Sequence, residues 1–196
     1  MIERLGPFLA AMLLTGAAHG ADCPDGKTAE KGFVLERPGV RSVFRPSPEK
    51  MVQVTNSFDS SPPQTQYYLG GLIEIFRTSK TGHFAVFPLD DLRSIFPLRE
   101  DAKEEVRWLE LDPERDTIEP GSLALQVTGK ETVKLGACEY KVLAVKLTFK
   151  AGDGDEIDAW TALFAPDLQA VLARRYDEGT DAQSTVAYRS IKPLIE

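Results

Sequence analysis

Histidine and cysteine are scarce in this sequence, which removes several classes of catalytic and metal site. The 196 residues include two histidines, His19 and His83, and two cysteines, Cys23 and Cys138. Zinc sites generally need several His and Cys ligands at regular spacing, and these residues show none. A Ser-His-Asp triad would depend on His83, and the sequence has no Gly-x-Ser-x-Gly motif. We predict no catalytic residue, no metal site and no cofactor.

Basic residues are outnumbered as well. Lys and Arg number 23 against 30 Asp and Glu, which gives a formal net charge of -7. This balance would repel a phosphate backbone, so we predict no nucleic-acid partner. The stretch "DGKT" at residues 25–28 is similar to the end of a phosphate-binding loop but lacks the upstream glycine, and we interpret it as part of an N-terminal arm.

No apolar run after residue 20 approaches the length of a membrane span. Before that point, Arg4 precedes an apolar run at residues 5–18, and "AHG" at residues 18–20 places small residues where a signal peptidase cleaves. The run is shorter than the ~20 residues that cross a bilayer. We predict a signal peptide at residues 1–20 and a periplasmic or secreted mature chain at residues 21–196, forming one domain without a transmembrane anchor. A lipid anchor on Cys23 is the alternative, although Asp22 stands where lipoprotein signals carry a small residue.

The mature chain keeps both cysteines. Proteins outside the cytoplasm usually bridge such a pair, so we predict a disulfide between Cys23 and Cys138. Two free thiols are the alternative, and redox catalysis is disfavoured because no Cys-x-x-Cys motif is present. The bridge would tie the N-terminal arm to the strand that begins near Cys138.

Most of the chain alternates between β-rich segments and turn residues. Strands are predicted at residues 32–37, 41–46, 50–58, 65–76, 83–89, 122–129, 131–135, 139–149, 156–165, 170–178 and 184–192. Short connections containing Gly, Pro, Asp and Ser imply antiparallel neighbours, and turns are predicted among others at "EPGS", residues 119–122, and at "GK", residues 129–130. Two short helical segments are predicted, one at residues 90–96 and one at the start of residues 99–111. In the strand at residues 139–149 both faces are apolar near its start, and the same is true of residues 156–165. The fold class is therefore mainly β, a single strongly curved antiparallel sheet forming a half-barrel or open barrel with one or two short helices.

The segments "VTGKETVKLGACEYKVLAVKLTF" at residues 127–149 and "WTALFAPDLQAVLARRY" at residues 160–176 carry a resemblance. They are similar to the C-terminal half of bacterial periplasmic β half-barrel families of unknown function, and "IFPL" at residues 95–98 resembles an earlier element of those families. The resemblance implies a curved sheet like that of LolA or the lipocalins. It implies no reaction and transfers no catalytic residue.

Three further motifs have both a functional and a structural interpretation. The acidic segment "AGDGDEID" at residues 151–158 could offer oxygen ligands to calcium, but Asp-Gly between two strands is a strong hairpin signal. "YYLGG" at residues 67–71 could be the lip of a ligand site, but a bulge that bends the sheet is favoured. Arg174 and Arg175 are neighbours on one strand, so at most one can enter a cavity, where it could hold an anionic ligand.

These observations favour a non-enzymatic envelope protein. We expect it to bind an apolar or lipid-like ligand, or a protein partner, in the concave sheet. The ligand-binding residues are not identified by the sequence. The alternative is an exported hydrolase that uses two buried carboxylates, which would have to lie side by side in the cleft of the sheet.

Overall fold

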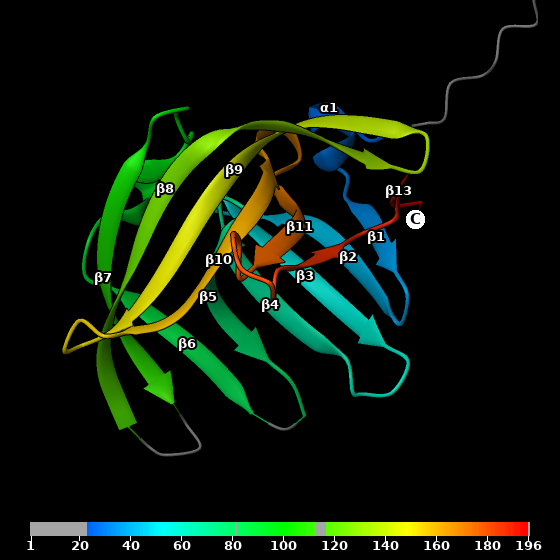
Figure 1. Ribbon diagram of the computed structural model, residues 1–196. Coiled ribbons are helices and arrows are strands. Elements are labelled where there is room, and N and C mark those ends of the chain that lie inside the picture. Colours follow the sequence, from blue (N-terminus) through cyan, green and yellow to red (C-terminus); the bar gives the residue numbers. More distant parts are fainter. Residues whose placement is uncertain (1–22, 81, 113–116, 196) are drawn as a thin grey trace, which may run out of the picture.

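The computed structural model describes residues 23–80, 82–112 and 117–195 (Figure 1). The predicted signal peptide lies outside these residues. The strands are β1 (Phe33–Arg37), β2 (Val40–Ser47), β3 (Met51–Phe58), β4 (Gln64–Leu69), β5 (Ile73–Thr78), β6 (His83–Pro88), β7 (Lys103–Asp112), β8 (Thr117–Leu135), β9 (Cys138–Ala151), β10 (Glu156–Ala165), β11 (Ala170–Tyr176), β12 (Ser184–Ala187) and β13 (Ser190–Pro193). The helical segments are α1 (Gly26–Ala29) and the 3₁₀ turns η1 (Leu92–Ile95) and η2 (Pro166–Leu168).

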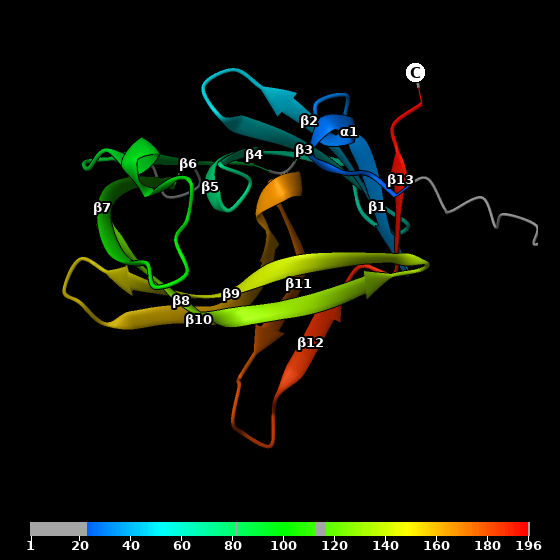
Figure 2. The same cartoon turned by 90° about the horizontal axis from the view of Figure 1, so that it is seen from above.

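All the strands belong to one antiparallel sheet, in the order β12-β11-β10-β9-β8-β7-β6-β5-β4-β3-β2-β1-β13. Seen from above, the strands β1 to β4 form one wall and β8 to β10 form the facing wall, with the bend of the sheet at β7 (Figure 2). The sheet is strongly curved and does not close in its hydrogen-bond order. The predicted fold class is confirmed.

The two edge strands of the sheet, β12 and β13, follow one another in the chain. Between them, the Tyr188 N–H donates to the Leu172 carbonyl at 3.1 Å, and the Arg189 N–H donates to the Glu36 carbonyl at 2.8 Å. Leu172 lies on β11 and Glu36 lies on β1. Residues 184–193 therefore connect one side of the curved sheet to the other.

The core lies on both faces of β9, the second strand of the long β8–β9 hairpin. Val142 and Ala144 belong to one buried cluster with β1 to β4, whereas Leu143 and Val145 belong to a second cluster with β5 to β8. Each fully buried apolar side chain of this size contributes about 1.5–3 kcal/mol. The hairpin predicted to be buried on both faces is β9–β10. This is confirmed for the start of β9 and for the second half of β10, whereas Ile157 in the first half of β10 is exposed.

Two predicted turns are in fact strand. "EPGS" and "GK" lie inside β8, which continues through them for 19 residues. Pro120 is tolerated because β8 pairs there with β7 alone, and its pairing with β9 begins at Gly121. The register shift between Val127 and Gly129 is a β-bulge, so the second glycine bends the strand and does not end it.

The helical predictions have mixed outcomes. The segment predicted at residues 90–96 contains the 3₁₀ turn η1, capped by the Asp91 carboxylate, which accepts from the Arg93 N–H at 3.1 Å. The helical part of residues 99–111 was overpredicted: the Ala102 N–H donates to the Arg99 carbonyl in one turn, and β7 then begins. Helix α1 was missed in the segment interpreted as part of an N-terminal arm, although Asp25 caps it through the Thr28 N–H at 2.8 Å.

Candidate ligand-binding cavity

The curved sheet encloses a cavity of about 320 Å³ between β2–β5 and β11–β12. Its size is at the lower end of the roughly 300–1,000 Å³ of small-molecule sites. The lining combines apolar side chains with amides, phenols and guanidiniums. It consists of Arg37, Val40, Phe44, Val54, Asn56, Phe58, Gln64, Gln66, Tyr68, Gly71, Arg77, Val171, Ala173, Arg174, Tyr176, Val186 and Tyr188.

A chain of hydrogen bonds crosses the wall formed by β2 to β5. The Ser42 hydroxyl donates to the Asn56 Oδ1 at 2.5 Å, and the Asn56 Nδ2 donates to the Gln66 Oε1 at 2.6 Å. The Gln66 Nε2 in turn donates to the Glu74 carboxylate at 2.8 Å. The Ser42 hydroxyl has a single hydrogen, which it donates to Asn56. The Tyr188 hydroxyl is therefore the donor in its 2.8 Å hydrogen bond with Ser42. This chain fixes the orientation of the polar groups that face the cavity.

Arg174 enters the cavity from β11, opposite that wall. Its Cζ lies 4.3 Å from the centre of the Trp160 ring, so the guanidinium stacks on the indole. Burial alone would lower the pKa of Arg174, but the phenols of Tyr68 and Tyr176 and the charge of Glu74 outweigh it and raise the pKa. The side chain is therefore a permanent cation inside the sheet.

Arg77 supplies a second cation on the facing wall. Its Cζ lies 5.0 Å from the centre of the Phe84 ring, and its Nε lies 3.3 Å from a Glu74 carboxylate oxygen. Tyr68 of the same wall is buried, and this burial raises the pKa of its phenol. Arg77 thus has a carboxylate partner within its own wall.

The cavity continues toward solvent. An open groove of about 540 Å³ shares Phe58, Gln64 and Arg77 with the cavity and reaches the loops that contain Pro62 and Gly82. A molecule held beside Arg174 could therefore extend along Phe58 to the outside. The cavity and the groove are therefore neighbours that share these three lining residues.

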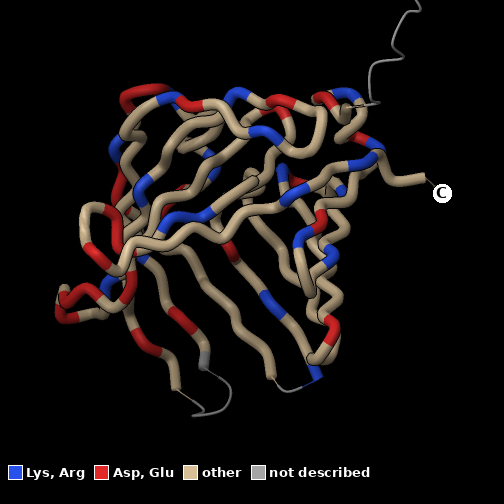
Figure 3. The backbone as a smooth tube through the Cα atoms, turned by 45° about the vertical axis from the view of Figure 1, so that its right-hand side comes forward, with Lys and Arg blue, Asp and Glu red and all other residues tan. Residues whose placement is uncertain are grey.

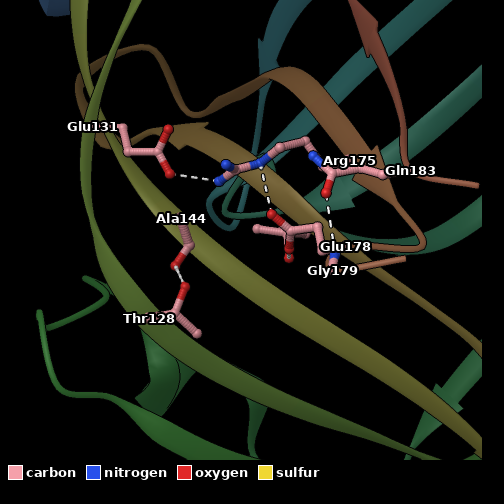
Figure 4. Close-up of polar contacts among 8 residues, drawn as sticks. Thr128, Glu131, Ala144, Arg175, Glu178, Gly179 and Gln183 are labelled. Atoms are coloured by element: carbon pink, nitrogen blue, oxygen red, sulfur yellow. Dashed lines mark hydrogen bonds and ion pairs between the residues drawn. The ribbon is translucent and has the colours of Figure 1, made fainter. Parts of the chain in front are cut away.

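Of the two neighbouring arginines on β11, only Arg174 lines the cavity, as the alternation of side chains along a strand predicts. Arg175 does not line the cavity, and its Nη2 donates to the Glu131 carboxylate at 2.5 Å while its Nε lies 3.0 Å from Glu178 (Figure 4). The other oxygen of Glu178 accepts from the Thr161 hydroxyl. This cluster joins β8, β10 and β11 and has a structural role.

Cys23 and Cys138 form the predicted disulfide, with Cα atoms 5.6 Å apart. The Tyr140 hydroxyl donates to the Pro24 carbonyl at 3.0 Å, and burial raises the pKa of that phenol to about 12. The bridge therefore fixes the segment before α1 against β9. Because its sulfur is bonded to Cys138, Cys23 has no thiol left for a lipid.

The other motifs lie away from the cavity or only touch it. His83 is exposed on β6, where its Nδ1 lies 2.8 Å from the Thr78 hydroxyl. The acidic residues of the β9–β10 turn are exposed: Asp153, Asp155, Glu156 and Asp158. Among the described residues, no group of three or more His, Cys, Asp or Glu is arranged to hold a metal ion. Lys and Arg alternate with Asp and Glu over most of the chain (Figure 3).

The segment "YYLGG" contains the predicted bulge, and its role as the lip of a ligand site stays a prediction. The register shifts between Tyr67 and Tyr68, which is the expected bulge, and Tyr68 and Gly71 also line the cavity. A Cβ on Gly71 would lie 1.7 Å from the Gln169 carbonyl oxygen, so only glycine allows this turn to approach the η2–β11 connection.

The sequence did not identify the amides of the cavity. Asn56, Gln64 and Gln66 occupy positions whose strand neighbours on the same face are apolar, such as Val54 and Tyr68. A polar residue in an otherwise buried row is the signal that could have identified them.

Among the described residues, no helix has both the length and the apolar character that crossing a bilayer would take. No family model and no curated protein matches the sequence. Among solved structures, the fold is similar to that of the hypothetical lipoprotein YmcC from Escherichia coli (K12), with a TM-score of 0.51 and 12% identity, over 83% of this chain and 87% of that chain. The likeness shows that the two proteins share a β-rich fold, and the finer LolA-like or lipocalin-like assignment stays a prediction.

Proposed function

We propose that this protein is an exported, non-enzymatic envelope protein that binds an apolar or lipid-like molecule in the cavity of its curved sheet. The observation that carries the proposal is the cavity of about 320 Å³, preformed between two walls of one sheet and continuous with an open groove. Small-molecule sites are typically such concave spaces, mainly apolar with a few fixed polar groups.

Export is supported by the bridge between Cys23 and Cys138. Disulfides persist in oxidising compartments and are rare in the cytosol. A protein with a similar fold is named a hypothetical lipoprotein, which agrees with a place in the envelope. The predicted signal peptide would deliver the chain to the periplasm or beyond.

Binding without catalysis is supported by the charges at the cavity. The alternative hydrolase requires two carboxylates side by side, and the cavity lining contains no Asp or Glu among the described residues. Glu74 lies nearby, but it accepts from Gln66 and pairs with Arg77. Its carboxylate is therefore engaged by two side chains of the wall.

Native mass spectrometry of the mature protein, purified from a bacterial periplasm, tests the proposal. We expect a co-purifying lipid-like mass that Val186→Trp removes, because Val186 lines the cavity on the exposed edge strand β12. Thr185→Trp is the matched control, because Thr185 is exposed on the same strand and does not line the cavity. Absence of any bound mass, together with no binding of added acyl-chain probes, would contradict the proposal.

A further inference from the structure

Arg174 is held in one fixed position at the centre of the cavity wall. It pairs with Ala162 of β10 on one side and with Val186 of β12 on the other. Its guanidinium plane stacks on Trp160 at 4.3 Å, which leaves the N–H groups at its edge to point along the plane. A planar donor group fixed in this way is suited to bind an oxyanion through two parallel hydrogen bonds.

The charge of Arg174 has no carboxylate partner of its own in the part of the chain that the structure describes. Among the described residues, no Asp or Glu oxygen lies within 4.0 Å of its guanidinium. Tyr68 and Tyr176 are neutral partners, and Glu74 is already bound by Gln66 at 2.8 Å and by Arg77 at 3.3 Å. A cation removed from water without a full counter-charge is costly, and an anionic ligand would offset that cost.

The cavity is also positively charged in a protein that is acidic as a whole. Its lining contains Arg37, Arg77 and Arg174 and no acidic residue among those described, whereas the net charge of the chain is -7. Apolar side chains also line the space, among them Val54, Phe58, Val171 and Val186, alongside the amides of Asn56, Gln64 and Gln66. Arg174 therefore offers a contact for an anion, and the apolar side chains, with Phe58 and Phe84 toward the groove, offer contacts for a hydrocarbon chain.

Resting on the proposed function, we infer that the ligand is an anionic amphiphile: an acyl or alkyl chain whose oxyanion head group binds Arg174 and whose chain extends past Phe58 into the open groove. The head group can be a carboxylate or a phosphate monoester, which share this chemistry. The cavity of about 320 Å³ has the volume of roughly ten water molecules, so a longer chain has to continue into the groove.

The test compares dodecanoate, dodecyl phosphate and dodecanol as ligands of the mature protein, each below its micellar concentration. Binding is measured by isothermal titration calorimetry on the wild type, Arg174→Met and Arg174→Lys. Arg41→Met is the matched control, because Arg41 is exposed on β2, does not line the cavity and carries the same charge. Thermal unfolding of each variant establishes that it is folded.

We expect the wild type to bind at least one anionic probe about 10- to 100-fold more tightly than dodecanol, since a hydrogen-bonded ion contributes that much. Arg174→Met is expected to remove this preference and to leave dodecanol binding unchanged, while Arg41→Met keeps it and Arg174→Lys keeps part of it. The preference of the wild type tests the inference even if Arg174→Met fails to fold.

The two proposals fail in different ways. Equal binding of dodecanol and both anions by the wild type would overturn the head-group inference and leave the proposed function standing. Binding of none of the three probes would overturn both. Whether dodecanoate or dodecyl phosphate binds more tightly identifies the head group.

Discussion

Gly71 is the residue at which one added methyl group is predicted to do the most damage. It turns the chain between β4 and β5 with φ of +75°, and a Cβ there would lie 1.7 Å from the Gln169 carbonyl oxygen. Real Cβ atoms essentially never approach another heavy atom within 3.0 Å, so the two backbones would have to separate by more than an ångström. Neither can yield easily, because Gln169 itself has a left-handed φ of 49° between η2 and β11.

The magnitude follows from two contributions. The left-handed backbone conformation costs an alanine about 1–2 kcal/mol. Displacement of two packed backbones adds to this, so that the total loss of unfolding free energy should exceed about 4 kcal/mol, as in the most severe single substitutions. Since domains are stable by about 5–15 kcal/mol, Gly71→Ala is predicted to lose a large part of the free energy of unfolding.

Urea unfolding followed by tryptophan fluorescence measures this loss, with Trp108 and Trp160 as reporters. Gly179→Ala is the matched control: it has φ of +81° and no heavy atom within 4 Å of the added Cβ, so it carries the backbone cost alone. We expect the control to lose about 1–2 kcal/mol. An equal loss in both variants would refute the argument, because the close approach to Gln169 would then have no cost.

Three further predictions concern covalent, polar and ionic contacts. The Cys23→Ser, Cys138→Ser double variant should lose about 4–5 kcal/mol of unfolding free energy in urea, since the bridge joins residues 115 apart; stability equal to the oxidised wild type would contradict this. Ser42→Ala should lose about 1–3 kcal/mol of unfolding free energy in the same assay, because Asn56 and Tyr188 each lose a buried hydrogen-bond partner. An unchanged unfolding free energy would contradict this, because the two side chains would then have found other hydrogen-bond partners. Hydrogen bonds from Arg107 lower the pKa of Asp90 to about 2, so its stabilisation is present above the unfolded pKa near 3.9 and is lost as the pH falls through about 2. The stability difference between the wild type and Asp90→Asn should shrink over that interval, and an NMR titration of Asp90 with a midpoint near 4 would disprove the assignment.

The strands could be predicted largely because their burial alternates in the sequence. Residues 139–149 lie within β9, and their apolarity on both faces correctly indicated a curved sheet. The turns predicted at Pro120 and Gly129 do not interrupt β8. Whether such a residue ends a strand depends on which neighbouring strands are paired with it at that point. Pairing is a long-range property that local turn chemistry does not contain.

The cavity could be predicted only in outline. Alternation along β11 showed that one of Arg174 and Arg175 could face inward, but the choice depends on the register with β10 and β12. The amide chain depends on Ser42, Asn56 and Gln66 meeting across three strands. No spacing within the sequence encodes that meeting, whereas the disulfide was predictable because the two cysteines had no other partner.

The connection between β12 and β13 has a consequence for the order of assembly. Until residues 184–193 are present, β1 lacks its partner β13, and β11 lacks β12, so both strands expose open edges while the rest of the sheet can already pair. The pairing of Glu36 with Ser190 spans most of the chain, and such distant contacts form slowly. Since Val186 and Tyr188 also line the cavity, the ligand pocket and the sheet edges are completed in the same late step. A chain released before that step would lack both its binding site and its protection against edge-to-edge aggregation.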